Sequence, residues 1–436
     1  MNQFLGSMPV VCRSIPFLVL SPTNPPESET GSDPISESIS TANAAGKIFP
    51  LLKGARRVVV KLGTQLLVRP DGELAIARLA SLVEQCADLK KQGREVIIVT
   101  SGAVGLGLQA LGLHPAALTL TDKQACAAVG QSLLMNTYRE LFRHYGLSTA
   151  QILLTAANFA DRHHYVSLQK TMARLLELNV VPIVNENDAV STVELAEDTV
   201  TRSFGDNDKL SALVAGKLSA DVLVILTNVE GIYTDNPFKN PQAEKISQID
   251  SLEQLNQIRM DGQSQLGRGG MSSKIEAVRV AAICGVHTVV ASGLTPDVLR
   301  QIFDSKASES MPGTLVVGHA EGLSGRKRWI GLASGYSGVV MVNDGAKRAL
   351  QETAASLLPV GVVQVHGDFR PRQVVSIQDV DGHELGRGVV NFSADEVRRV
   401  MGHGSQSLAE RLGYPVEHDV IVRRDNLVIY EERPPQ

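Results

Sequence analysis

Two short clusters of carboxylate and carboxamide side chains stand where chemistry could take place. The first, Asn185–Asp188, directly follows the apolar, β-branched run Val181–Val184, which predicts a buried strand. We expect the four polar residues to lie outside the core. In open α/β sheets, ligands bind beyond the carboxyl ends of strands. The second cluster, Gly205–Asp208, opens another apolar helix. The two clusters together predict a site for a small polar or zwitterionic ligand.

Two other predicted strands end in residues that suit anions. Lys61 closes the first strand, and Gly63 beyond it would let the backbone approach a ligand while the lysine supplies a point charge for a phosphate. Taken in isolation, Lys61 is better interpreted as a lysine whose stem snorkels from a strand end. Ser101 and Gly102 end the second strand before a helix, where backbone N–H groups favour anions. A simple N-cap by Ser101 is the alternative.

A glycine-rich loop, Gly267–Lys274, leads into an apolar helix and predicts an anion-binding nest with Lys274 one turn inside. The Walker A spacing is absent, and a flexible turn is the alternative interpretation. The strand at 221–226 ends in the polar pair Thr227 and Asn228. The loop Gly231–Pro237 that follows could cover an adenine or could be an ordinary surface loop.

Strands and helices alternate from Arg56 onward, which predicts an α/β fold with an open, mostly parallel sheet and helices on both faces. The expected strands are 57–61, 95–100, 150–154, 180–184, 221–226 and 287–291, and the expected helices are 74–91, 122–145, 165–178 and 273–284.

The sequence pattern changes after about Gly318. Glycine-rich turns there separate short strands and predict a small β-barrel-like domain. Its expected strands are 338–342, 360–366, 373–377, 386–391 and 420–422, with helices at 344–350 and 394–400. At the other end, residues 1–53 include a segment rich in Ser, Pro, Thr and Glu and predict a disordered extension.

Composition narrows the function classes. The net charge is −4 and aromatic residues make up only 4% of the 436 residues, which argues against a strongly basic nucleic-acid binder. The four cysteines are scattered, so neither a zinc site nor a disulfide framework is indicated. No apolar run reaches the roughly 18 residues that a membrane span needs. We therefore expect a cytoplasmic protein that is not bound to a membrane.

Six motifs in this order make the chain resemble the amino acid kinase family, and within it the glutamate 5-kinases: Lys61-Leu-Gly-Thr64, Val99-Thr-Ser-Gly-Ala103, Asn185-Glu-Asn-Asp-Ala-Val190, Gly205-Asp-Asn-Asp208, the loop from Gly231 and Gly269-Gly-Met-Ser-Ser-Lys274. The C-terminal part resembles the PUA domain of many such kinases, on the segments Lys327–Ile330, Ser356–Gly361 and Gly386–Val390. The resemblance implies three regions: the extension 1–53, a catalytic domain over 54–319 and a PUA domain over 328–436.

The resemblance also implies a reaction, in which the γ-carboxylate of L-glutamate attacks the γ-phosphate of ATP and gives L-glutamyl 5-phosphate, the first step of proline biosynthesis. It implies catalytic roles for Lys61, Lys274 and Asp208, and glutamate binding by Ser101, Asp188 and Asn207. The implied nucleotide-binding residues are Lys61, Thr227, Asn228, Arg268, Gly269, Gly270, Met271, Ser272, Ser273 and Lys274. Magnesium would bridge the β- and γ-phosphates, with no metal ligand assigned to the protein.

Three departures from the family pattern concern regulation and nucleotide contact. Asn228 stands where the family usually has Asp, Arg268 stands where a small residue is common, and residues 191–204 form a longer loop than usual. The family implies feedback inhibition by proline through that region.

As partners, the resemblance implies a homo-oligomer, dimer or tetramer, and a glutamyl phosphate reductase that receives the product. The alternatives are a kinase for acetylglutamate, aspartate or a nucleoside monophosphate, and an RNA-binding protein. We do not expect RNA binding, because residues 328–436 hold 12 Lys and Arg against 14 Asp and Glu.

Overall fold

The computed structural model describes residues 51–114, 118–155, 158–159, 162–190, 207–237, 240–258, 270–304, 311–318, 330, 336–353, 355–416 and 419–429. None of the helices within these ranges combines the length and the apolar character needed to cross a membrane.

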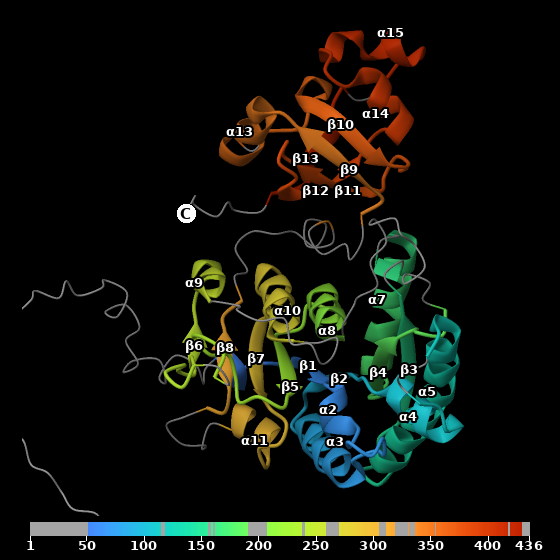
Figure 1. Ribbon diagram of the computed structural model, residues 1–436, viewed down its shortest axis with the longest axis vertical. Coiled ribbons are helices and arrows are strands. Elements are labelled where there is room, and N and C mark those ends of the chain that lie inside the picture. The colour runs from blue at the N-terminus through green and yellow to red at the C-terminus, as the bar shows by residue number, and fades with distance from the viewer. Residues whose placement is uncertain are drawn as a thin grey trace, which may run out of the picture. The chain divides into compact units, whose positions relative to one another are not determined.

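The larger of the two domains is built on one eight-stranded sheet (Figure 1). In spatial order its strands are β3 (Thr149–Leu154), β4 (Val181–Glu186), β2 (Glu95–Val99), β1 (Arg57–Leu62), β5 (Val222–Thr227), β7 (His287–Ser292), β8 (Thr314–Val316) and β6 (Gln248–Ile249). All pairs are parallel except β7 with β8. The predicted open, mostly parallel sheet is confirmed, while the short edge strands β8 and β6 were not anticipated because two or three residues carry no detectable period.

Register brings the ends of the central strands together. Lys61 lies opposite both Val99 of β2 and Ile225 of β5, and Val99 lies opposite Val184 of β4. Because these strands are parallel, their carboxyl ends meet at one edge of the sheet. The chain leaves β1 toward β2 on one side and adds β5 on the other, which is the kind of switch point where open α/β sheets bind ligands.

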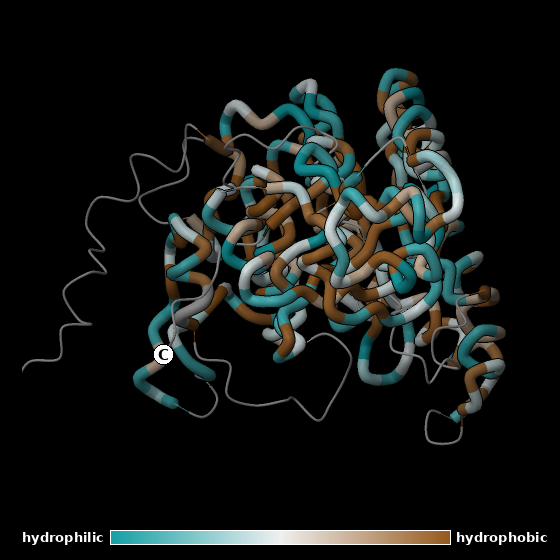
Figure 2. The backbone as a smooth tube through the Cα atoms, turned by 90° about the horizontal axis from the view of Figure 1, so that it is seen from above, coloured by the Kyte–Doolittle hydropathy of each residue, from teal (hydrophilic) through white to brown (hydrophobic). Residues whose placement is uncertain are grey.

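Helices cover both faces of this sheet. They are α2 (Thr64–Leu67), α3 (Ile76–Lys91), α4 (Ala103–Leu111), α5 (Leu120–Arg143), α7 (Arg162–Glu177), α8 (Asn207–Lys217), α9 (Leu252–Gln257), α10 (Met271–Ile283) and α11 (Val298–Phe303). Successive residues of β1 belong to different cores: Val58 and Val60 pack in one cluster, and Val59 packs in the other. Side chains alternate across a strand, so β1 is buried on both faces. Figure 2 shows hydrophobic and hydrophilic stretches alternating along the trace.

Helices α4 and α5 touch backbone to backbone. A Cβ at Gly130 would come within 1.8 Å of the Ala103 carbonyl oxygen, and a Cβ at Gly107 within 1.9 Å of the Cys126 carbonyl oxygen. Only glycine permits this approach. A capping box between Thr119 and the N3 residue of α5 fixes where α5 begins. The contact places the middle of α5 beside the carboxyl end of β2, from which α4 starts.

The first described residues already belong to the hydrophobic core of this domain. Leu52 is fully buried in the same cluster as Val58, and the Arg94 guanidinium donates to the carbonyl oxygens of Leu52 at 3.2 Å and Lys53 at 3.3 Å. The extension predicted over 1–53 therefore includes residues that pack and bond with the domain. Residues 1–50 lie outside the described residues.

The C-terminal domain has a five-stranded sheet in the order β10 (Val362–Gly367), β9 (Gly338–Val342), β11 (Val374–Gln378), β12 (Glu384–Val390) and β13 (Val422–Ile429). Its helices are α13 (Asp344–Glu352), α14 (Ala394–Val400), α15 (Leu408–Leu412) and the 3₁₀ turns Pro359–Gly361 and Ser405–Ser407. The predicted small β domain is confirmed. The prediction of 420–422 for the last strand was too short, because the exposed polar run Arg423–Asp425 hides the continuation of β13.

Candidate active site

A buried carboxylate lies between two buried lysines at the carboxyl edge of the sheet. Asp208, in the first turn of α8, is 0% exposed. Its Oδ1 lies 2.5 Å from Nζ of Lys61, on β1, and its Oδ2 lies 3.1 Å from Nζ of Lys274, in the first turn of α10. Lys61 and Lys274 are 213 positions apart in the sequence, with Asp208 between them, and the fold brings all three into one cluster.

The charge of this cluster suits an anionic ligand. Two ammonium groups and one carboxylate carry a net charge of +1, in a place where Lys61 is 4% exposed and Lys274 6% exposed. Buried charges are costly unless they are paired and hydrogen-bonded. Each ammonium has three N–H donors and can serve more than one acceptor. Asp208 therefore holds both ammonium groups at one carboxylate, and the net positive charge of the cluster suits an anion.

The residue before Asp208 organises a second, uncharged half of the site. Asn207 directs Nδ2 toward the Thr100 carbonyl oxygen at 2.7 Å, Ser101 Oγ at 2.8 Å and Asn185 Oδ1 at 2.9 Å. These acceptors lie at the ends of β2 and β4. Within the described residues, Asn207 Oδ1 is buried and has no hydrogen-bond partner.

Ser101 does not act as the helix cap that was the alternative. The N-cap of α4 is Gly102, at φ 97°, and no side chain caps this helix. A φ in the left-handed region favours glycine, and the turn leaves Ser101 Oγ in contact with Asn207. The hydroxyl is thus held at the N-terminal end of α4, where backbone N–H groups favour an anion.

The expectation that Asn185–Asp188 lies wholly outside the core was wrong. β4 continues through Asn185 and Glu186, which are 1% and 9% exposed. Asn185 can be buried because both ends of its amide are bonded: Nδ2 donates to Gln131 Oε1 at 2.8 Å, and Oδ1 accepts from the Glu186 backbone N–H at 2.9 Å. Asp188 lies in the turn beyond β4 and is partly exposed. Residues 191–204 lie outside the described residues.

The residues expected to bind the nucleotide follow β5 and open α10. Thr227 is 6% exposed at the end of β5, its Oγ1 donates to Asn228 Oδ1 at 3.2 Å, and Asn228 is exposed. Gly270 is the N-cap of α10, and Met271, Ser272, Ser273 and Lys274 form its first turn. Ser273 Oγ donates to the Gly270 carbonyl oxygen at 2.9 Å and lies 3.4 Å from Asp208 Oδ2. Arg268 and Gly269 lie outside the described residues.

The loop after β5 is anchored. The backbone N–H of Ile232 donates to Thr314 Oγ1 at 2.8 Å, and Ile232 is fully buried. The Gly293 backbone N–H, just past β7, donates to the Thr227 carbonyl oxygen at 2.8 Å. The first bond ties the start of the 231–237 loop to β8, and the second joins the ends of β5 and β7.

Two buried amides in this network, Asn185 and Gln131, were not among the predicted site residues. Asn185 is the first residue of the Asn185–Val190 motif, and its polar side chain directly after an apolar strand could have indicated a site residue. Gln131 lies on α5, 54 positions away from its partner, and only its polar character on a helix face could have drawn attention to it.

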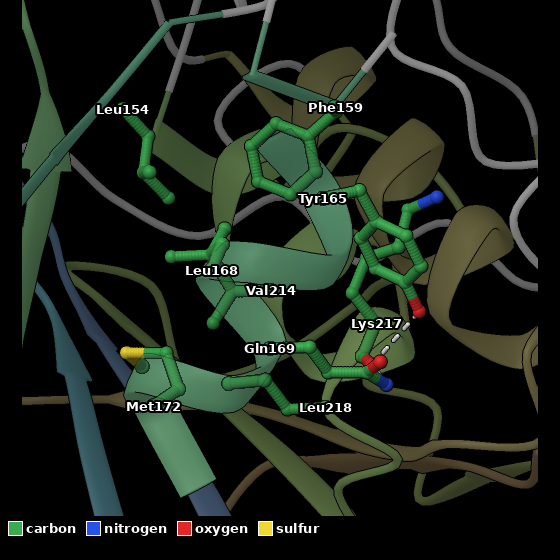
Figure 3. A pocket seen from close by; sticks show the side chains of 9 residues that line it. All are labelled: Leu154, Phe159, Tyr165, Leu168, Gln169, Met172, Val214, Lys217 and Leu218. Carbon is green, nitrogen blue, oxygen red and sulfur yellow. Dashed lines mark hydrogen bonds between the residues drawn. The ribbon is translucent and has the colours of Figure 1, made fainter. Parts of the chain in front are cut away.

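A separate apolar pocket lies between α7 and α8 and contains none of the predicted site residues (Figure 3). Tyr165 and Gln169 of α7 donate to the Lys217 carbonyl oxygen at 3.5 and 3.1 Å, and Lys217 Nζ lies 4.6 Å from the Tyr165 ring centroid. This contact ties α7 to the C-terminal end of α8, the helix that begins with Asn207.

Comparison with known proteins agrees with the division of the chain into two domains. Residues 56–292 match the amino acid kinase family and residues 338–412 match the PUA domain. The glutamate 5-kinase of Chromobacterium violaceum is 42% identical over 379 residues, which cover 87% of this chain and 99% of that protein. The glutamate 5-kinases of Methylococcus capsulatus and Moorella thermoacetica are each 41% identical, over 87% of this chain and 98% and 97% of theirs. The chain belongs to the amino acid kinase family, and within it to the glutamate 5-kinases that carry a C-terminal PUA domain.

Proposed function

We propose that this protein phosphorylates the γ-carboxylate of L-glutamate with ATP, giving L-glutamyl 5-phosphate and ADP, the first step of proline biosynthesis. The observation that carries the proposal is the adjacency of Asn207 and Asp208. One residue belongs to a neutral, amide-lined half suited to an amino acid, and the next belongs to a lysine-rich half suited to a phosphoryl group.

The lysine pair supplies the catalytic charge. Phosphoryl transfer needs little covalent chemistry from a protein, so positioning and neutralisation of the equatorial oxygens dominate. Lys61 and Lys274 reach the same carboxylate from β1 and α10, and Asp208 thereby holds them in place before the reaction begins. Preorganised cations that face charge developing in the transition state need no reorganisation as it forms.

Glutamate binding falls to Ser101, Asn207 and Asp188. The Ser101 hydroxyl at the start of α4 suits a carboxylate, and the buried Asn207 Oδ1 is an acceptor suited to an ammonium N–H. The Asp188 carboxylate offers the charge that an α-ammonium group needs. A glutamate bound here would present its γ-carboxylate to the lysine half.

The nucleotide would lie along the residues after β5 and at the N-terminus of α10, with Lys61, Thr227, Asn228 and the segment 268–274 as its contacts. Mg²⁺ would be carried mainly by the phosphates, as is usual for this ion. Each carboxylate oxygen of Asp208 contacts a lysine ammonium group. This arrangement fits a carboxylate that positions the two lysines. When bound, the ion neutralises phosphate charge.

Several finer assignments rest on family membership. They are feedback inhibition by proline, a homo-oligomeric state, transfer of the product to a glutamyl phosphate reductase and a cytoplasmic location. The 191–204 loop proposed for the proline response lies outside the described residues. We do not expect the PUA domain to bind RNA, because its acidic and basic residues nearly balance.

An ATP assay with glutamate, acetylglutamate and aspartate as acceptors tests the function, with the acyl phosphate trapped as a hydroxamate. We expect glutamate to be the strongly preferred acceptor and its hydroxamate to depend on ATP. Preference for acetylglutamate or aspartate would overturn the substrate assignment, and ATP hydrolysis without any hydroxamate would overturn the reaction.

A further inference from the structure

Gln131 is a buried glutamine that the proposed mechanism does not use. It lies on α5 and is 7% exposed, and its Oε1 accepts from Asn185 Nδ2 at 2.8 Å. Asn185 Oδ1 in turn accepts from Asn207 Nδ2 at 2.9 Å, and Asn207 Nδ2 also reaches Ser101 Oγ. Three amides thus connect α5 with the uncharged half of the site, which we call the substrate half because we propose that it binds glutamate.

Two backbone groups set the direction of every amide in this row. The Glu186 backbone N–H can only donate, so Asn185 must present Oδ1 there, 2.9 Å away. The Thr100 carbonyl oxygen can only accept, so Asn207 must present Nδ2 to it, 2.7 Å away. With Asn185 Oδ1 fixed, its Nδ2 faces α5, and Gln131 has to offer Oε1.

The same hydrogen bonds determine where the Asn207 side-chain oxygen points. With Nδ2 committed to three acceptors, Asn207 Oδ1 points to the opposite side, where it is buried with no hydrogen-bond partner in the described part of the chain. A buried acceptor without a partner is unfavourable, and it persists where a ligand donor meets it. The orientation of this oxygen depends on the row that begins at Gln131.

From this geometry we propose that Gln131 is a positioning residue for glutamate: acting through Asn185, it holds the Asn207 amide in the orientation that binds the amino acid substrate. The inference rests on the proposed function. The close α4–α5 contact lies next to this residue, since Gly130, directly before Gln131, is the glycine that approaches Ala103 of α4.

Gln131→Met removes the acceptor while keeping the length and much of the packing of the side chain. We expect the KM for glutamate to rise roughly threefold to tenfold, as for loss of one buried hydrogen bond, with the KM for ATP within about twofold of the parent. Gln131→Glu keeps an acceptor at Oε1, and the Nε2 that it replaces has no partner among the described residues. Burial favours the uncharged carboxyl group, which is close in shape to the amide, so this variant should restore the glutamate KM to within about twofold.

The matched control is Gln85→Met. Gln85 is 2% exposed on α3, accepts from the Leu299 backbone N–H at 2.9 Å and donates to the Ser81 carbonyl oxygen at 3.2 Å, without contact to the site residues. It should lower Tm and leave both KM values unchanged. The rise of Tm with added glutamate, measured without nucleotide, gives a second readout of substrate binding. This glutamate-induced rise of Tm should be smaller than in the parent for Gln131→Met and unchanged for Gln85→Met.

Equal changes in both KM values for Gln131→Met, no change in either, or a Gln131→Glu variant as impaired as Gln131→Met would overturn the positioning role. If Gln131→Met does not fold, Gln131→Asn withdraws the acceptor by one methylene and is judged by the same KM ratio. A parent enzyme without glutamate kinase activity would refute the proposed function instead, so the two failures are distinguishable.

Discussion

Asn207 and Asp208 are neighbours in sequence, yet their side chains contact different parts of the site. Asn207 donates to the ends of β2 and β4, and Asp208 contacts Lys61 and Lys274. Successive residues at a helix start point about 100° apart, since an α-helix has 3.6 residues per turn. The N-terminus of α8 therefore joins the uncharged half, which we propose binds the substrate, and the lysine half, which we propose binds the phosphoryl group, in one element.

Replacing Lys274 by Met should lower kcat by about 10²-fold or more, because the cation stabilises charge that develops in the transition state. The aliphatic stem is retained, so packing changes little. Lys91→Met is the matched control, since Lys91 is exposed and its pair with Asp88 is a surface ion pair. Steady-state kinetics check the prediction. Near-normal kcat in Lys274→Met would make Lys274 a structural residue.

Removing the Asp188 carboxylate should weaken binding of the amino acid far more than binding of ATP. Asp188→Ala is expected to raise the KM for glutamate while the KM for ATP changes little, because binding shared by ground state and transition state is lost. Asp188→Asn separates charge from size and should behave like Asp188→Ala. Acetylglutamate, which lacks the ammonium charge, offers a check from the substrate side. Equally efficient phosphorylation of both acceptors would contradict this role.

The start of the catalytic domain can be located by two deletions. Loss of residues 1–50, which have a composition typical of disorder, should leave Tm within about one or two degrees. Deletion through residue 53 also removes Leu52 from the core, and burial of a leucine contributes about 1.5–3 kcal/mol. That protein should melt several degrees lower, as should Leu52→Ala in the full chain. Identical melting of the two deletions would show that Leu52 contributes nothing.

Stability should depend on pH through Lys217. Burial lowers the pKa of this lysine from its usual value to about 7, against a smaller opposing effect of Cys284. Between about pH 7 and the ordinary lysine value near 10.4, the unfolded chain binds more protons than the folded chain, so stability rises with pH. Below pH 7 both states are protonated and the destabilisation is complete.

Lys217→Met removes this dependence. The Tm of the variant minus that of the parent should be most positive near pH 6.5 and should fall steadily toward pH 9.5. Thermal melts of both proteins at several pH values measure it, and the subtraction cancels all other titrating groups. A difference that does not vary with pH would mean that Lys217 titrates normally in the folded protein.

Periodicity and strand ends predicted most of what positions the site. Lys61, Thr227 and the 185–188 cluster were placed by where apolar strands stop, and the parallel register then brings them to one edge. The burial of Asn185 was not predictable in this way. A sequence pattern shows that the side chain is polar, but it does not show that Gln131 and Asn207 form hydrogen bonds with it. Such pairings depend on tertiary contact between segments 54 and 22 positions apart.

The backbone contact of Gly107 and Gly130 also bears on attempts to change which amino acid this enzyme accepts. A library that diversifies these two glycines would consist largely of unfolded proteins, because any added Cβ meets a carbonyl oxygen below 2 Å. The partly exposed turn at 187–190 has no such constraint. Selection for new acceptors should begin at that turn, with the α4–α5 crossing left untouched.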